Sequence, residues 1–230
     1  MGPADLLEVV ASELGDVLPG VVYFGGTVVP LHFDAELLGG NEPRPTDDVD
    51  VLVMFEGSEL AFHDFERALH SKGWRPNASP EKRLKFAMIS PSGVQVDLVP
   101  LFMLSGEDVC REALPFAVEL RLGSGRVVKV LSSAGLLAAK FSAFEDRGAG
   151  DVLGSPDFED IAMLVGCVPG LVEDAGRLSG PLRQRIAAGA EMLGSTDVVD
   201  YAAASIPRNV PVEQFLATLD ALVKVGGVSR

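Results

Sequence analysis

The residues best suited to chemistry are the carboxylates that precede and begin an apolar segment, Thr46-Asp47-Asp48-Val49-Asp50-Val51-Leu52-Val53. In an extended strand side chains alternate between the two faces, so Asp48 and Asp50 point to the same side. Two like charges held close together cost free energy unless a cation bridges them. Mg²⁺, or Mn²⁺, is the natural cation because hard ions prefer oxygen ligands. The pair predicts a metal site, although acidic pairs also cap helices and occur in loops.

A third carboxylate strengthens this prediction. Asp97 interrupts the apolar segment Val94-Gln95-Val96-Asp97-Leu98-Val99, and a charged group in such a strand needs a partner. If this strand lies beside the first, the three carboxylates form a site for two metal ions. The alternative is a salt bridge between Asp97 and a basic residue within the sheet.

The segment Phe24-Gly25-Gly26-Thr27 predicts a turn between a strand and a helix. The absence of side chains at Gly25 and Gly26 lets backbone N–H groups approach a polyphosphate, and a helix N-terminus would add positive potential there. Alone this is an ordinary turn. Its significance comes from the order strand, Gly-Gly-Thr, helix, loop, acidic strand and second acidic strand.

That order resembles the polymerase-β-type nucleotidyltransferase superfamily. Arg44-Pro45-Thr46-Asp47-Asp48-Val49-Asp50 is similar to the R-x-T-x-D-V-D motif of the abortive-infection AbiEii type of toxin nucleotidyltransferase. The subfamily also has a helical half with a Lys, an Arg and a later acidic motif. The residues that match these are Lys140, Arg147 and Asp157-Phe158-Glu159-Asp160. The resemblance spans roughly residues 20 to 165 and leaves the role of residues 170–230 open.

The resemblance implies transfer of a nucleoside monophosphate from an NTP to an acceptor hydroxyl. Asp48, Asp50 and Asp97 would hold two metal ions, and Asp97 is our first choice for the general base. The residues expected to contact or position the nucleotide are Gly25, Gly26, Thr27, Arg44, Thr46, Lys140 and Arg147. Lys140 and Arg147, seven residues apart on a predicted helix, would share one face. Asp157 and Asp160 would orient Lys140 or favour the start of their own helix.

The chain alternates between predicted helices and short strands up to Leu131 and is helical afterwards. The predicted strands are 21–24, 49–55, 84–89, 94–99, 118–122 and 127–131, with hairpins at 90–93 and 123–125. The predicted helices are 5–14, 27–38, 58–70, 132–147, one from Pro156 and three after Pro181, Ser195 and Pro211. We therefore expect an α+β fold, a small mixed sheet with flanking helices in residues 1–131 followed by a helical domain in residues 132–230.

Composition narrows the class of protein. The most apolar stretch, from Val17 to Phe33, is broken by glycine and proline, and the N-terminus lacks a secretory pattern, so we expect a cytoplasmic protein without a membrane segment. The two cysteines, Cys110 and Cys167, suit reduced core thiols better than a disulfide or a zinc site. The three histidines lack a further nearby ligand and fit solvated or packed positions.

The acceptor is open to three interpretations: RNA, protein or a small molecule. The net charge of −14 repels polyanions and would suit a cationic small molecule such as an antibiotic. A local basic cluster, made up of Lys72, Arg75, Lys82, Arg83 and Lys85, would instead suit RNA, with Trp74 stacking on a base, or it is a solvated surface. The toxin interpretation implies a cognate antitoxin. A catalytically silent nucleotide-binding module is a further alternative.

Overall fold

The computed structural model describes all of the chain except residues 16–19, 41, 43, 55–58, 78–85, 149–150, 153, 197 and 228–230, together with the side chains of 59, 60, 147 and 148. The chain folds into two compact units. The first consists of Met1–Leu31, Pro43–Arg111 and Ala117–Leu131, and the second of His32–Glu42, Glu112–Phe116 and Ser132–Arg230.

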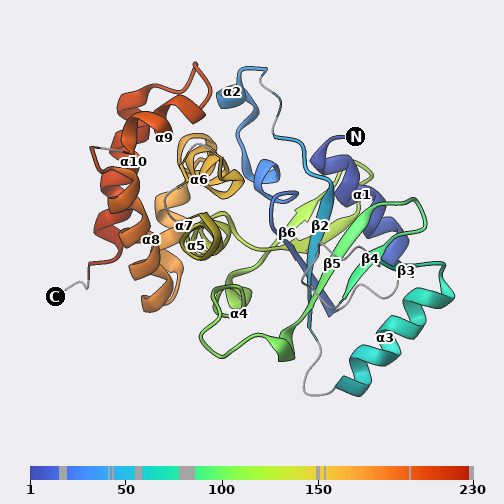
Figure 1. Ribbon diagram of the computed structural model, residues 1–230. Coiled ribbons are helices and arrows are strands. Elements are labelled where there is room, and N and C mark those ends of the chain that lie inside the picture. Colours follow the sequence, from blue (N-terminus) through green and yellow to red (C-terminus); the bar gives the residue numbers. More distant parts are fainter. Residues whose placement is uncertain are drawn as a thin grey trace. The chain divides into compact units, whose positions relative to one another are not determined.

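The first unit is built around a mixed sheet of seven strands in the order β3-β4-β5-β2-β1-β7-β6 (Figure 1). The strands are β1 (Val21–Phe24), β2 (Asp48–Val53), β3 (Arg75–Pro76), β4 (Ala87–Ile89), β5 (Gln95–Pro100), β6 (Val118–Arg121) and β7 (Val127–Val130). β2 runs parallel to β5 and antiparallel to β1, and β1 runs parallel to β7. The predicted mixed sheet and both predicted hairpins, β4–β5 and β6–β7, are confirmed.

Alternation along β2 explains its place in the centre of the sheet. Val49, Val51 and Val53 are completely buried on one face, whereas Asp48 and Asp50 are half-buried on the other. β-Branched residues fit such a pleated, buried surface well. The strand is therefore anchored by one face and presents its carboxylates on the other.

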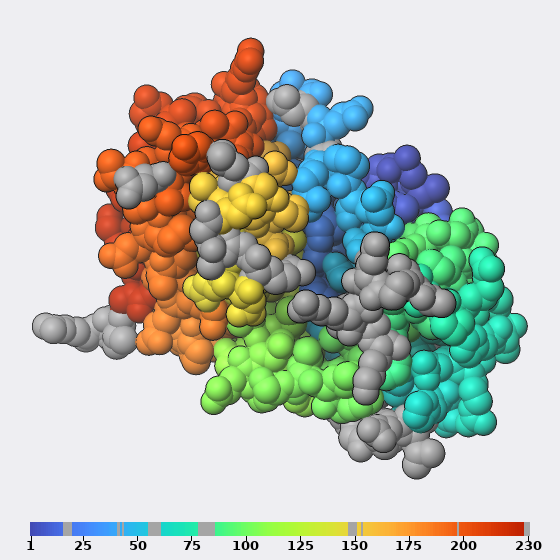
Figure 2. Space-filling model, viewed as in Figure 1, coloured from blue at the N-terminus to red at the C-terminus, as the bar shows by residue number. Residues whose placement is uncertain are grey.

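Helices flank the sheet within this unit. α1 (Pro3–Leu14) packs against β2 and buries the helical stripe that the sequence predicts, comprising Leu6, Leu7, Val10, Ala11 and Leu14. α3 (Glu59–Ser71) lies at the surface in turquoise in Figure 2 and buries Phe62, Phe65 and Leu69. A short 3₁₀ helix, η3 (Leu101–Met103), follows β5.

The second unit is helical, with α5 at its centre. Its helices are α2 (Ala35–Leu38), η4 (Leu114–Phe116), α5 (Ser133–Ala143), η5 (Phe144–Gly148), α6 (Pro156–Cys167), α7 (Leu171–Arg177), α8 (Gly180–Leu193), α9 (Val199–Ser205) and α10 (Val212–Val225). The short helix α4 (Val109–Ala113) is divided between the two units after Arg111. α5 packs against α6, α7 and α8, and α10 packs against α8 (Figure 1). Within the described ranges the late chain is helical as predicted, with α7 as an additional helix.

Two predicted helices are interrupted. The segment 27–38 is not one helix: a turn is followed by the 3₁₀ helix η2 (Val29–His32), and α2 begins anew after Asp34. Pro30 lies inside η2, where it lacks an N–H to continue an α-helical ladder. The helix expected to reach Arg147 ends as an α-helix at Ala143 and continues as the π-helix η5, whose hydrogen bonds span one residue more per turn.

The apolar segments belong to these packed units. Among the described residues, no helix is both long and apolar enough to cross a membrane.

The two cysteines are not joined by a disulfide. Cys110 and Cys167 are free thiols, as predicted; Cys167 is buried as a core thiol would be, whereas Cys110 is half-buried. Burial raises the pKa of Cys167 to about 11, with a smaller contribution from Asp34, so this thiol is a poor nucleophile at neutral pH.

Candidate active site

The register of the sheet brings the three predicted carboxylates onto one face. Asp50 of β2 is the direct neighbour of Asp97 on the parallel strand β5, and Asp48 is the neighbour of Gln95. Neighbouring residues of a parallel pair point to the same side, and residues two apart share a face. Asp48, Asp50 and Asp97 therefore project from one side of two central strands.

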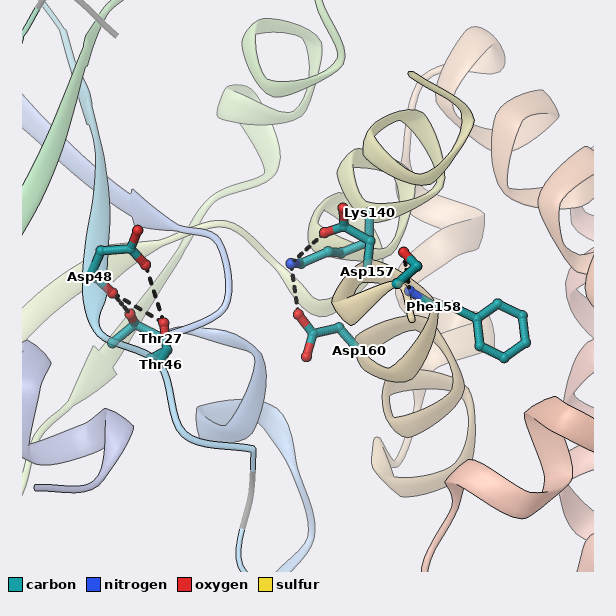
Figure 3. Close-up of polar contacts among 8 residues, drawn as sticks. Thr27, Thr46, Asp48, Lys140, Asp157, Phe158 and Asp160 are labelled. Atoms are coloured by element: carbon teal, nitrogen blue, oxygen red, sulfur yellow. Dashed lines mark hydrogen bonds and ion pairs between the residues drawn. The ribbon is translucent and has the colours of Figure 1, made fainter. Parts of the chain in front are cut away.

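The three side chains differ in exposure. Asp97 is only 5% exposed, whereas Asp48 and Asp50 are half-buried. Asp48 Oδ1 accepts a hydrogen bond of 3.2 Å from the Thr46 hydroxyl, which turns this carboxylate toward the loop that precedes the strand (Figure 3).

The donor set can be compared with what a divalent metal needs. Carboxylate oxygens on a shared face are the ligand type that Mg²⁺ and Mn²⁺ take, so the residue types and their backbone placement fit. Within the described part of the chain, however, no three Asp, Glu, His or Cys side chains form a group that could hold a metal ion as they stand. Binding one ion through all three carboxylates would require their rotamers to change.

The glycine turn after β1 lies directly against the acidic face. Gly25 has a φ of +74°, and a Cβ atom there would lie 1.9 Å from Asp50 Oδ2. A side chain at this position would thus be strained and would collide with the carboxylate. Glycine is required here because the turn and Asp50 are in close contact.

Thr27 connects this turn to the start of β2. Its side chain is completely buried, and its hydroxyl donates to the backbone oxygen of Asp48 at 2.5 Å (Figure 3). This geometry gives the hydroxyl a structural role, so any phosphate contact from Thr27 would have to come from its backbone.

The expected helix N-terminus behind this turn needs correction. Because a turn and the four-residue η2 follow Gly26, no α-helix begins there to supply a macrodipole. Phosphate binding at Gly25 and Gly26 would depend on local backbone N–H groups instead. Arg44, also predicted to contact phosphate, is exposed on the loop before β2.

In the second unit, Lys140 lies between two carboxylates of α6. Its Nζ is 2.9 Å from Asp157 Oδ1 and 2.7 Å from Asp160 Oδ2, and Lys140 is 9% exposed (Figure 3). Burial alone lowers the pKa of Lys140, but Asp160 and Asp157 together raise it above its ordinary value. The ammonium is therefore charged, and the predicted pairing of Lys140 with these two residues is present.

The predicted shared face of Lys140 and Arg147 depended on one uninterrupted α-helix. The π-helix η5 changes the rotation per residue between the two positions, so they no longer share a face by helical spacing. The Arg147 side chain itself lies outside the described residues.

The basic cluster also differs from what an RNA-binding surface would need. The prediction that Trp74 stacks on a base is wrong, because Trp74 is 1% exposed within the first unit. In the basic cluster, Lys72 donates to the Leu14 carbonyl at 3.2 Å and Arg75 is exposed, while Lys82, Arg83 and Lys85 lie outside the described residues.

Two polar residues on the acidic face were missed by the sequence analysis. Gln95 is the register neighbour of Asp48, and its Oε1 accepts a hydrogen bond of 3.0 Å from Asn77 Nδ2. The signal for Gln95 was present, because it lies two residues before Asp97 on the same predicted strand. Asn77 had no such signal, since its approach depends on how the strands pair.

The comparisons with known proteins concern the fold. No protein-family model and no curated protein sequence matches the chain. Among solved structures, the chain is similar to the crystal structure of an antigenic nucleotidyltransferase-like protein from Paracoccidioides brasiliensis. The TM-score is 0.57 and the sequence identity 19%, and the match covers 89% of this chain and 93% of that one. A weaker similarity, with a TM-score of 0.43 and 14% identity over 87% and 89% of the two chains, is to the solution structure of the antibiotic-resistance factor ANT(2'')-Ia. The first of these shows that the chain has the fold of a nucleotidyltransferase-like protein.

Proposed function

We propose that this chain is a metal-dependent nucleotidyltransferase that transfers a nucleoside monophosphate from an NTP to an acceptor hydroxyl. The observation that carries the proposal is the register of β2 and β5, which puts Asp48, Asp50 and Asp97 on one face, with Gly25 packed against Asp50. A glycine turn beside clustered carboxylates is what a metal–triphosphate complex needs. The nucleotidyltransferase-like fold is consistent with this chemistry.

The order of strands supports a division of the site into two sides. β1, which ends at the glycine turn, lies on one side of β2, and β5 followed by β4 lies on the other. We assign the triphosphate to the β1 side, with Gly25 and Gly26 donating backbone N–H groups to it and Arg44 neutralising charge. The acceptor then approaches from the β5 side, opposite the leaving pyrophosphate, as in-line attack requires.

Each of the chain's own groups has a defined part in the transfer. Asp48, Asp50 and Asp97 would hold Mg²⁺ or Mn²⁺, which supplies charge neutralisation of the triphosphate and activation of the acceptor hydroxyl. Asp97, on the acceptor side, takes the hydroxyl proton as the acceptor oxygen bonds to the α-phosphorus and the bond to pyrophosphate breaks. Thr46 positions Asp48 through its hydrogen bond. The sequence resemblance also assigns Lys140 and Arg147 to the triphosphate, and Asp157 and Asp160 to orienting Lys140.

The experiment that tests the proposal incubates the purified protein with each α-labelled NTP, Mg²⁺ or Mn²⁺, and separate RNA, protein and small-molecule fractions of a cell extract. We expect label to enter one fraction only when a divalent ion is present. Asp50→Asn should reduce transfer by at least about a hundredfold, as loss of a metal ligand does. Asp47→Asn is the matched control, because it removes the same charge from an exposed neighbour outside the strand. Equal transfer by the Asp50→Asn variant and the wild type would overturn the assignment.

For the acceptor, we propose RNA or protein in a toxin with a cognate antitoxin, because Arg44, Thr46, Asp48 and Asp50 match the R-x-T-x-D-V-D pattern. Induced expression should then arrest growth in wild-type form and leave it unaffected with Asp50→Asn.

A small-molecule acceptor is the second candidate, and two observations favour it. The net charge of −14 attracts cations, and burial of Trp74 removes the expected base-stacking residue. Label that enters only the small-molecule fraction, with no growth arrest, would select this candidate.

A further inference from the structure

The face of the sheet that carries the three carboxylates continues beyond β5 onto β4 and β3. One row across these strands consists of directly paired residues, Asp48, Gln95, Ile89 and Arg75. Directly paired residues of neighbouring strands point to the same side of a sheet. Gln95 and Arg75 therefore share the acidic face, and they lie on the side of it to which we assigned the acceptor.

The neighbouring row contains a small residue that lets two side chains meet across β4. Ala87 of β4 is paired with Asp97, and the Asn77 N–H donates to the Ala87 carbonyl at 2.7 Å directly after β3. Asn77 Nδ2 also donates to Gln95 Oε1 at 3.0 Å. Asn77 and Gln95 come from opposite sides of β4, so their amides meet where Ala87 contributes only a methyl group.

This hydrogen bond determines which end of the Gln95 amide can meet a ligand. Oε1 faces Asn77, so the planar amide directs Nε2 and its two N–H donors away from Asn77. Gln95 is half-buried, which means that the protein holds the side chain while part of it remains exposed. The side chain thus offers an oriented, uncharged donor beside the carboxylates, and its natural partner is an oxygen of a bound molecule.

The position of Gln95 relative to Asp97 limits what this molecule can be. The two residues are two positions apart on β5, a separation of about 7 Å along the strand. One sugar ring covers this distance when its attacking hydroxyl meets Asp97 and a second hydroxyl meets Gln95. A serine or threonine side chain of a protein has a single hydroxyl and would leave the Gln95 amide without this partner.

We propose that Gln95 is a specificity-determining residue that selects a sugar as the acceptor. The inference rests on the proposed function and narrows its acceptor. Gln95 Nε2 donates a hydrogen bond to one oxygen of the sugar, while another hydroxyl of the same ring gives its proton to Asp97. That hydroxyl oxygen bonds to the α-phosphorus as the bond to pyrophosphate breaks. Asn77 contributes by orienting the Gln95 amide.

Arg75 distinguishes the two sources of such a sugar. It is exposed on β3, two strands and about 10 Å from Gln95 in the same row. The terminal ribose of an RNA carries a phosphodiester that Arg75 can bind, whereas a free amino sugar carries no phosphate. Arg75→Gln should therefore weaken transfer to RNA and leave transfer to a small sugar unchanged.

The test measures transfer from the preferred NTP, with Mg²⁺, to the fraction of the cell extract that accepts the label. Mass spectrometry of the product should place the new phosphodiester on a sugar hydroxyl. Gln95→Leu keeps the approximate size of the side chain and removes the donor. We expect it to raise the KM for this fraction about three- to tenfold, the usual effect of one lost hydrogen bond. The Kd for the NTP, measured by calorimetric titration, should not change, because we assign the triphosphate to the β1 side.

Two further variants separate recognition of the acceptor from a general effect on the fold. Gln214→Leu makes the same change at an exposed position of α10 and should leave the KM for the acceptor unchanged. Asn77→Ala removes the group that orients Gln95 and should raise this KM by a smaller factor. In the Gln95→Leu background, Asn77→Ala should have no further effect on the KM.

The possible outcomes distinguish this inference from the proposed function. If the wild type transfers label but Gln95→Leu has an unchanged KM for the acceptor, or also binds the NTP more weakly, Gln95 does not select the acceptor and the proposed function stands. Label on a protein side chain would have the same meaning. If the wild type labels no fraction with any NTP, both proposals are overturned.

Discussion

Lys140 is a charged side chain inside the helical unit, and its partners determine what it can do. Its ammonium lies within 3 Å of Asp157 and Asp160, so the three groups carry a formal charge of −1. Breaking such an arrangement by removing the cation leaves two carboxylates buried beside each other. Because the ammonium and both carboxylates are buried, removing the Lys140 side chain should lower the stability of the fold.

We expect Lys140→Met to lower the free energy of unfolding by about 3–5 kcal/mol, the usual cost of breaking a buried ion pair. Chemical denaturation would measure the change. Lys224→Met, at an exposed position of α10, is the matched control and should change stability by less than about 0.5 kcal/mol. If the two variants are equally stable, the pairing has no structural importance.

The pH dependence of stability follows from the same pairing. Because the folded protein holds the pKa of Lys140 above its ordinary value of 10.5, the folded state retains this proton longer than the unfolded state does. The stabilisation is complete below pH 10.5 and is lost as the pH rises through the folded-state pKa. The difference in unfolding free energy between wild type and Lys140→Met should therefore shrink above pH 10.5. A difference that grows with pH would contradict this.

At the scale of elements, the hydroxyl of Thr27 joins the glycine turn to strand β2. Thr27→Val keeps the shape of the side chain but removes the hydroxyl that donates to the Asp48 carbonyl, which should lower the free energy of unfolding by about 1–3 kcal/mol. Thr27→Ser keeps the hydroxyl and loses a methyl group, at a cost of about 1 kcal/mol. In urea titrations we expect the valine variant to be the less stable of the two. The reverse order would mean that packing of the methyl group, and not the hydrogen bond, holds the turn to the strand.

The sequence predicted the elements whose signals are local. β1 was predicted with the bounds that the structure has, and the hairpins followed from turn residues between apolar segments. The shared face of Asp48 and Asp50 followed from alternation alone. These features depend on neighbours in the chain, so they can be read without knowledge of the tertiary fold.

The features that escaped prediction depend on long-range pairing. The register of Asp50 with Asp97 joins residues 47 positions apart and was only assumed. The burial of Trp74 depends on how distant parts of the chain pack around it. The same is true of the hydrogen bond from Asn209 Nδ2 to the Glu36 carbonyl in α2, because the two residues are 173 positions apart. The break between η2 and α2, by contrast, had a local signal in Pro30. Whether residues 1–131 and 132–230 are separate folding domains stays a prediction; in the structure, His32–Glu42 and Glu112–Phe116 cluster with the late helices.

At the scale of the whole molecule, the charge of −14 affects the proposed substrate. An NTP is a polyanion, and it would have to approach a face with three carboxylates on a protein of the same sign. At physiological ionic strength the Debye length is about 8 Å, so distant surface charges are largely screened and nearby carboxylates dominate. Divalent cations close to the three carboxylates should therefore have more effect on NTP binding than the net charge of the protein.

We expect the Kd for the preferred NTP to be at least about tenfold weaker in EDTA than with Mg²⁺, because the carboxylates repel the triphosphate until a cation neutralises both. Calorimetric titration at 0.15 M salt would measure the difference. Replacing Asp48, Asp50 and Asp97 together by Asn should strengthen metal-free binding and abolish the gain from Mg²⁺. Replacing the exposed Glu191, Glu213 and Asp220 by their amides removes the same charge from the helical unit and should leave both constants nearly unchanged. If both triple variants respond alike, the net charge of the protein, and not the acidic face of β2 and β5, governs nucleotide binding.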